Sequence, residues 1–198
     1  MTYTANAIVL GIMQYRDFDR IYTVYTREFG KLTLLARGAN KIKSKLAGHI
    51  EIGVHSSIMF ASGKGFDILA QARSLDSFAC ARMDAQKLTA LCALVEIVDK
   101  LTETRNEDEA VFQLLYCALH KLSENNHNNT RDFLYHYFLH LLILLGHAPN
   151  MKDEQALQTL LVADIADDGI LVKEDARRVI AIYARQALDE KQLYCFPL

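Results

Sequence analysis

The first 75 residues alternate short apolar runs with polar turns, which is the pattern of a small β protein. Runs rich in β-branched and aromatic side chains predict five strands, at residues 7–13, 20–26, 31–36, about 49–61 and 66–74. Ser62-Gly63-Lys64-Gly65 has the composition of a hairpin turn. Five short strands in this length indicate a closed barrel, and the OB-fold is the commonest five-stranded candidate.

Beyond residue 78 the apolar residues recur every three or four positions, which predicts helices. The helical segments are expected at residues 80–98, 111–122, 130–145, 151–163 and 173–189. The third of these is apolar nearly all round and is therefore expected to be central. Asn129 or Thr130 can cap it, and Gly146 and Pro149 end it. Strands followed by helices predict an α+β chain, with an OB-fold β-barrel at residues 1–78 and an all-helical C-terminal domain at 79–198.

The charge of the chain is unevenly distributed. The formal net charge of the 198 residues is −2, and 51% of them are hydrophobic, which is enough to form a core. Residues 1–78 carry ten basic and six acidic side chains, whereas residues 79–198 carry 12 basic and 18 acidic ones. A basic module attracts polyanions, and halves of opposite charge suggest two domains with different partners.

The cysteines and the apolar runs predict a cytoplasmic protein with no membrane contact. The four cysteines are widely spaced and form no Cys-x-x-Cys pair, so we expect reduced thiols. The N-terminus lacks the basic and apolar regions of a signal peptide. The longest strongly apolar stretch, residues 137–145, is shorter than the roughly 18 residues that a membrane-spanning helix needs.

The strongest local signal is a basic loop that follows the third predicted strand. Four cations occur in nine residues with no acid among them: Arg37, Lys41, Lys43 and Lys45. Such a loop can neutralise several phosphates, although a merely solvated loop has the same composition. Further cations lie at predicted strand ends and turns of the basic half, namely Arg16, Arg20 and Lys64. These seven residues are the candidate DNA-binding set.

Aromatic residues are interleaved with these cations, as in proteins that bind single-stranded nucleic acids. They are Tyr15, Phe18, Tyr22, Tyr25 and Phe29. Most of them are expected to fill the barrel. Tyr22 and Tyr25 cannot share a strand face, so at most one of the two is expected to be exposed.

The sequence gives no positive sign of catalysis, a cofactor or a metal. His136 and His140 are one helical turn apart, with Asp132 a turn earlier, but no cysteine or glutamate completes a zinc site. Asp164, Asp167 and Asp168 lack the alternating pattern of a calcium loop. Phosphate-binding loops, dinucleotide fingerprints and nucleophile elbows are absent from the sequence. We therefore expect a protein that is not an enzyme.

Several segments, in order along the chain, resemble the bacterial recombination mediator family RecO. They are residues 7–10, 19–30, 35–48 and 137–149, and the third, which contains the basic loop, is the most specific. The resemblance implies an N-terminal OB-fold and a C-terminal helical domain. It also implies a DNA repair function in the bacterial nucleoid, in which the protein binds single- and double-stranded DNA, anneals complementary strands, and acts with RecR to load RecA onto strands coated by single-strand-binding protein.

The resemblance further implies that the helical domain binds the C-terminal tail of the single-strand-binding protein. This tail is acidic and ends in an aromatic residue, so its site needs an apolar pocket edged by cations. The candidate edge residues are Arg131, His136, Arg177 and Arg178. Many relatives carry a four-cysteine zinc module after the Gly-x-x-Pro end of the central helix. Here residues 150–154 contain no cysteine, so we expect the form without zinc.

Two other classes of function stay open at this point. One is an adaptor that binds the tail or RecR and contacts DNA only incidentally. The other is a hydrolase or nuclease, for which Asp164, Asp167 and Asp168 form the only, and poor, candidate metal cluster.

Overall fold

The structure is a computed structural model that describes residues 1–41, 44, 46–124, 129–147, 157, 160, 163, 172–188 and 193–195. It divides into two compact units. Unit 1 comprises Met1–Phe78 and Thr102–Tyr116, and unit 2 comprises Ala79–Leu101 and Cys117–Leu198. The predicted helix at 151–163 and the acidic turn at 164–168 lie almost entirely outside the described residues.

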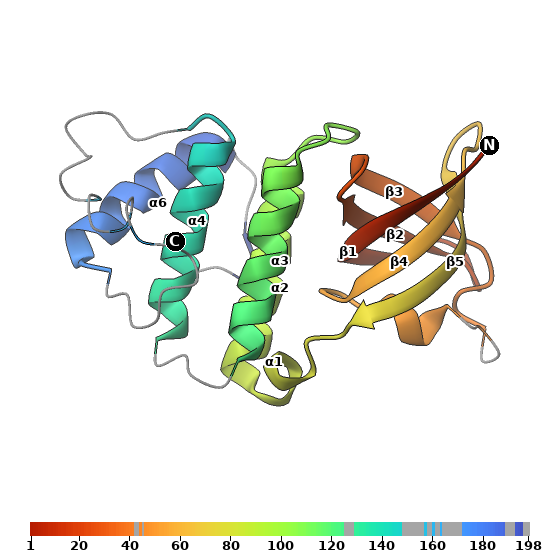
Figure 1. Cartoon of the computed structure of the whole chain (residues 1–198), viewed down its shortest axis with the longest axis horizontal. Coiled ribbons are helices and arrows are strands. Elements are labelled where there is room, and N and C mark those ends of the chain that lie inside the picture. The colour runs from red at the N-terminus through yellow and green to blue at the C-terminus, as the bar shows by residue number, and fades with distance from the viewer. Residues whose placement is uncertain are drawn as a thin grey trace. The chain divides into compact units, whose positions relative to one another are not determined.

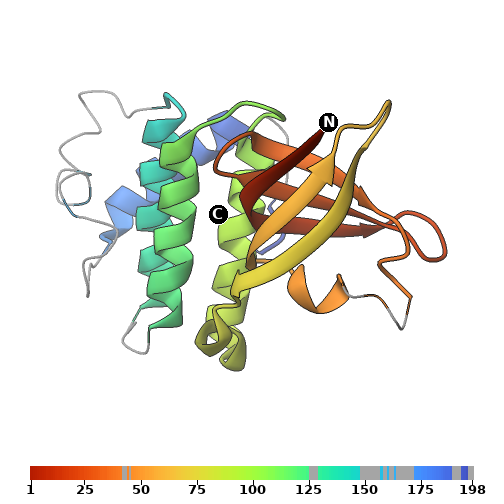
Figure 2. The same ribbon diagram turned by 45° about the vertical axis from the view of Figure 1, so that its right-hand side comes forward.

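Unit 1 is built on a closed barrel of five strands (Figures 1 and 2). The strands are β1 (Thr2–Gln14), β2 (Arg20–Thr26), β3 (Gly30–Ala36), β4 (His55–Ala61) and β5 (Asp67–Asp76). They pair in the order β1-β2-β3-β5-β4, and β4 returns to β1. All pairs are antiparallel except β3 with β5. The predicted OB-like barrel followed by helices is confirmed.

The barrel interior is filled by alternate residues of the strands. Tyr22 and Val24 of β2 face it, together with Leu32 and Leu34 of β3, because side chains two positions apart share a strand face. Tyr25 points to the opposite face of β2, where its hydroxyl group donates a hydrogen bond of 3.3 Å to the Asp108 carbonyl oxygen. Both tyrosines are therefore buried, each on its own side of the strand.

The fourth strand begins later than the sequence pattern predicts. A 3-10 helix, η1 (Ala47–His49), occupies the start of the predicted segment 49–61, and Ile50 behind it is buried in the barrel core. Gly53 then turns the chain with a φ of 76°, a conformation that glycine adopts without steric penalty. The apolar residues of this stretch reach the core from a turn, so hydrophobicity alone did not mark the strand boundary.

Residues 102–116, which follow the helix α2 (Ala85–Leu101) in sequence, belong to the barrel unit. Thr104 forms a parallel bridge with Lys31, and the Arg105 amide donates to the Lys31 carbonyl oxygen at 2.8 Å. The Arg105 guanidinium binds the buried Asp67 carboxylate at 2.7 Å. These contacts attach the segment to β3 and to the start of β5. The helix α3 (Glu109–Ser123) begins in this unit, where the Asp108 carboxylate caps it.

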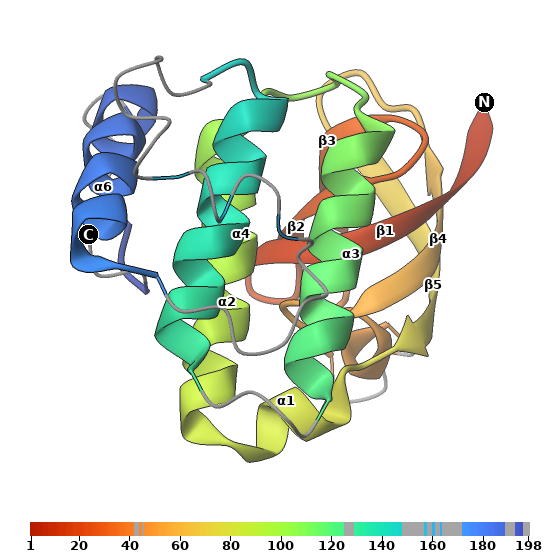
Figure 3. The same ribbon diagram turned by 60° about the vertical axis from the view of Figure 1, so that its left-hand side comes forward.

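Unit 2 contains helices, as predicted (Figure 3). The described helices that lie wholly in it are α1 (Ala79–Met83), α2, α4 (Thr130–Leu144) and α6 (Glu174–Leu188). Asp84 accepts hydrogen bonds from the Gln86 and Lys87 amides, so the predicted helix at 80–98 is two helices with a cap between them. The helix α4 contacts both α2 and α6 and buries ten residues, which confirms its predicted central position. Asn129 caps it by accepting from the Asp132 amide.

Gly30 provides a test of how closely residues 102–108 lie against the barrel. It has a φ of 64°, and a Cβ atom built on it would lie 2.0 Å from the Asn106 carbonyl oxygen. Gly48 in η1 has nothing within 4 Å of such an atom. We expect Gly30→Ala to lower the free energy of unfolding by about 2 kcal/mol or more, and Gly48→Ala to change it by less than about 0.5 kcal/mol. Denaturant unfolding of both variants measures this, and equal effects would contradict the described close approach.

Candidate nucleic-acid interface

Two loops of the barrel are joined by hydrogen bonds. The first is the β1–β2 turn, and the second follows β3. The Gly38 amide donates to an Asp19 carboxylate oxygen at 2.8 Å, and the Asn40 amide donates to the Phe18 carbonyl oxygen at 3.0 Å. The Arg20 guanidinium donates to the Asn40 side-chain oxygen at 2.6 Å. The two loops therefore present one surface whose backbone is fixed before any ligand binds.

A third turn, between β4 and β5, joins the same surface through an aromatic contact. The rings of Tyr15 and Phe66 meet edge to face, with their centroids 5.7 Å apart. This turn leads into the start of β5, where Asp67 and Ile68 pair in parallel with Leu34 and Leu35 of β3. We call residues 15–20, 37–41 and 62–66 together the turn face.

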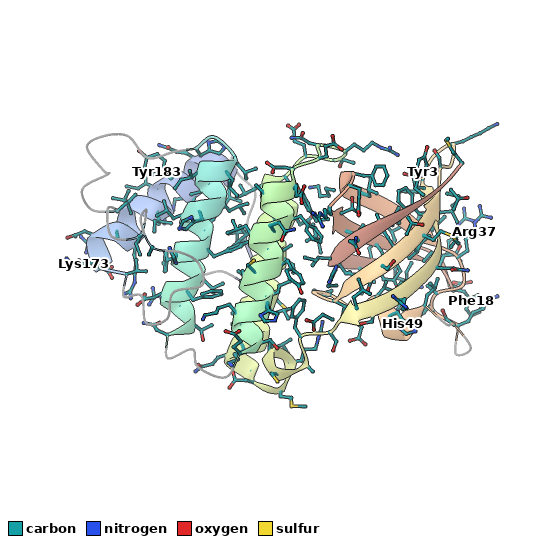
Figure 4. The ribbon with its side chains drawn as sticks, viewed as in Figure 1. Tyr3, Phe18, Arg37, His49, Lys173 and Tyr183 are labelled. Carbon is teal, nitrogen blue, oxygen red and sulfur yellow. The ribbon has the colours of Figure 1, made fainter. Side chains whose placement is uncertain are left out.

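The turn face gathers five of the seven predicted DNA-binding residues. Arg16, Arg37, Lys41 and Lys64 are exposed, and Figure 4 shows Arg37 and Phe18 at the same end of the barrel, pointing away from the strands. Arg20 is half-buried and is engaged by Asn40. Lys43 and Lys45 lie outside the described residues. With two acids, Asp17 and Asp19, among these residues, the turn face has an excess of positive charge.

Two of these cations lie over aromatic rings. The Arg16 guanidinium carbon is 5.2 Å from the centroid of the Tyr15 ring, and the Lys41 ammonium nitrogen is 5.5 Å from that of Phe18. Such contacts are weak at exposed sites, because the ring attracts the cation only through its quadrupole. A ligand can therefore displace Arg16 and Lys41 from these rings at a small cost in free energy.

The other aromatic candidates are not available to a ligand. Tyr22 and Tyr25 are each 1% exposed, and Phe29 packs against the barrel core. Burial and the nearby Asp108 carboxylate raise the pKa of Tyr25 to about 12. Phe66 is exposed on the turn face but was missed from the sequence. Its position beside the glycines of the predicted hairpin turn was the signal that could have identified it.

In unit 2 the candidate tail-binding residues do not form a single edge. The His136 side chain is 1% exposed, and its Nε2 atom lies 3.2 Å from the Leu160 carbonyl oxygen and 2.9 Å from Nε2 of His140. The expectation that His136 lines an accessible pocket edge is therefore wrong. His136 is one of the ten buried residues of α4.

Arg177 is also engaged. Its guanidinium group forms an ion pair with the buried Asp132 carboxylate at 2.5 Å and a second contact with Glu174 at 3.3 Å. The hydrogen bond from Arg177 to Asp132 raises the pKa of the guanidinium group further, so this residue stays charged. Its role in the described structure is to join α6 to the start of α4.

The exposed face of α6 carries a different set of residues. Arg178, Ile182 and Arg185 are exposed and follow one another at four- and three-residue spacing, so they share a face. Ile182 is 55% exposed, which is high for an aliphatic side chain on a helix that buries four others. Sequence analysis identified Arg178 but not its two neighbours. Arg131 is exposed on α4, with its guanidinium carbon 5.8 Å from the centroid of the Tyr135 ring.

Other kinds of site find no support within the described ranges. These residues contain no group of three or more His, Cys, Asp and Glu side chains that could hold a metal ion. Residues 150–154, where relatives would carry a zinc module, lie outside them, so the expectation of a form without zinc stays a prediction. Among the described helices, none is both long enough and apolar enough to cross a membrane.

Comparisons with known proteins identify the same family that the sequence segments resemble. The family model "Recombination protein O N terminal" matches residues 1–78, and "Recombination protein O C terminal" matches residues 82–159. A protein of Syntrophomonas wolfei named DNA repair protein RecO is 31% identical over 88% of this chain and 70% of its own length. Proteins of the same name from Roseiflexus and Halalkalibacterium halodurans are 34% and 32% identical, and the matches span only 55% and 49% of their lengths.

Proposed function

This chain belongs to the RecO family of DNA repair proteins, and we propose that it is a non-enzymatic recombination mediator that binds DNA on the turn face. In this role it binds single- and double-stranded DNA and anneals complementary strands. It acts with RecR to load RecA onto strands coated by single-strand-binding protein.

The observation that carries the proposal is the convergence of cations from three separate turns. Arg16, Arg37, Lys41 and Lys64 are far apart in the sequence but share the turn face with Arg20. In OB-folds the loops between strands 1 and 2 and between strands 4 and 5 are the ligand-binding loops. Cations at those loops lower the free energy of DNA binding because each phosphate contact releases condensed counterions.

This arrangement suits annealing because annealing needs charge neutralisation without base selection. Two strands approach each other only if the repulsion between their phosphates is reduced. Phosphate contacts from flexible Lys and Arg side chains reduce it and carry no sequence information. They also exchange readily, so the strands can shift register until their bases pair. The fixed backbone of the two joined loops keeps the cations on one surface while the strands move.

The first prediction concerns the salt dependence of DNA binding. We expect Arg37→Glu/Lys41→Glu to weaken binding of any oligonucleotide sequence about equally, because phosphates are alike in all sequences. The slope of log affinity against log salt should fall by about 0.7 for each phosphate of a single strand that the variant no longer neutralises. Fluorescence anisotropy of a labelled oligonucleotide across a salt series measures both. Adding Lys43→Glu and Lys45→Glu tests the two loop lysines whose positions the structure does not describe.

The matched control is Arg178→Glu/Arg185→Glu, which makes the same change in net charge on α6. It should leave the salt slope unchanged. If the two double variants flatten the slope equally, the effect comes from net charge and DNA does not bind on the turn face.

A second function is favoured by the exposed face of α6. An acidic peptide that ends in an aromatic residue needs apolar contact beside cations, and Ile182 between Arg178 and Arg185 offers this chemistry. We therefore propose this face, with Arg131 as a further candidate, as the site for the tail of single-strand-binding protein. If this were the main function and the turn face bound DNA poorly, the protein would be an adaptor for the tail or for RecR.

The tail site is tested with the same two double variants. A labelled peptide with the sequence character of such a tail should bind the wild-type protein. Arg178→Glu/Arg185→Glu should weaken this binding at least tenfold, whereas Arg37→Glu/Lys41→Glu should not change it. Peptide binding that neither variant alters would exclude the α6 face.

A further inference from the structure

We propose that Phe18 is a stacking platform for unpaired nucleobases, with Tyr15 and Phe66 as a second platform beside it, so that the turn face binds single strands in preference to duplexes. This inference rests on the proposed DNA-binding function, but it assigns a different kind of contact, to bases and not to phosphates. It also assigns that contact to particular rings.

Most of the exposed aromatic rings of the described residues lie on the turn face. Four aromatic side chains are exposed among the described residues, and three of them are Phe18, Tyr15 and Phe66, at 55%, 41% and 36%. The fourth, Tyr194, lies in unit 2. Single exposed rings are common on protein surfaces, but three on adjoining turns form an apolar patch within a basic surface. Basic grooves with aromatic platforms are the form that sequence-tolerant binding of single strands takes.

Phe18 is held in place by the hydrogen bonds of its backbone and of its neighbour Asp19. Its carbonyl oxygen accepts the Asn40 amide, and the neighbouring Asp19 carboxylate accepts the Gly38 amide. The ring therefore projects from a turn that is fixed on both sides, and its exposure does not result from a loose loop. A platform of this kind loses little conformational freedom when a base stacks on it.

A cation, the Lys41 ammonium group, lies over the Phe18 ring. The Lys41 ammonium group, 5.5 Å from the ring centroid, occupies the π face that a base would use. The Lys41 backbone is fixed, because its amide donates to the Gly38 carbonyl oxygen at 3.1 Å and its carbonyl accepts the Ser44 amide at 2.9 Å. When a base stacks on Phe18, the ammonium group moves off the ring and can contact the phosphate attached to that nucleotide. The Arg16 guanidinium group lies over the Tyr15 ring in the same way.

The preference for single strands follows from base stacking. In a duplex both faces of each internal base are already covered by neighbouring bases, so a protein ring can stack only on unpaired or terminal bases. The cations of the turn face make no such distinction, because both forms of DNA present phosphates. Removing the ring should therefore lower affinity for single strands and leave affinity for duplexes nearly unchanged.

The absence of tryptophan from the chain makes the test direct. Phe18→Trp introduces a single tryptophan that keeps a π face, and Leu75→Trp places one on an exposed position near the far end of β5. Saturating each variant with an oligothymidine strand should quench the fluorescence of the first and not that of the second. A blunt duplex of equal length should quench neither. Phe18→Leu should bind the single strand about tenfold more weakly than wild type and the duplex equally well.

The outcomes separate this inference from the proposed function. If Phe18→Trp binds the single strand without quenching and Phe18→Leu keeps wild-type affinity, the platform is overturned although DNA binding stands. If the wild-type protein binds neither form of DNA at low salt, the proposed function fails and the platform fails with it. Equal losses for single strand and duplex in Phe18→Leu would show that the ring supports the fold of the turn and does not stack on bases.

Discussion

The barrel unit depends on a short parallel pairing that closes the ring of strands. Leu34 and Leu35 of β3 pair with Asp67 and Ile68 of β5, and this contact is what leaves the sheet without a free edge. The same contact fixes where the turns lie. The β4–β5 turn leads into this pairing, and its Phe66 ring contacts Tyr15 of the β1–β2 turn. Residues 102–108 stabilise the pairing of β3 with β5, since Arg105 binds both the Lys31 backbone and the Asp67 carboxylate.

Contacts between the turns themselves then complete the turn face. Once the turns are together, local hydrogen bonds through Asn40 and Asp19 fix the two loops against each other. Cations and aromatic rings that lie far apart in the sequence then share one surface. That surface combines cations with exposed aromatic rings. In the proposed function, the cations bind the phosphates of single strands and duplexes alike, and the rings bind unpaired bases.

The sequence predicted those parts of the molecule that local patterns determine. Strand β2 was predicted at its observed bounds, because a run of β-branched and aromatic residues between polar turns has few alternatives. The central position of α4 followed from its apolar circumference. The basic loop was identified because four cations in nine residues need no structural context to be noticed. The reasoning that Tyr22 and Tyr25 point to opposite faces was also correct, but it did not reveal that both faces are covered.

The parts that the sequence missed depend on contacts between distant residues. Nothing in residues 102–116 indicates that they belong with the barrel, because the contacts of Arg105 and Asp108 are made to single backbone and side-chain groups. His136 was a candidate for an accessible pocket edge, whereas the structure buries its side chain on α4. The place of Phe66 on the turn face depends on its contact with Tyr15, a residue distant in the sequence.

The most direct measurement is a map of the residues that touch DNA. Photo-crosslinking of a single-stranded oligonucleotide that carries 5-iodouracil, followed by mass spectrometry of the digested protein, identifies the crosslinked residues. We expect crosslinks within residues 15–20, 37–41 and 62–66, with Phe18 among them, and we expect them to disappear when unlabelled oligonucleotide competes. Crosslinks confined to residues 79–101 and 117–198 would place the DNA on the helical unit and contradict the account.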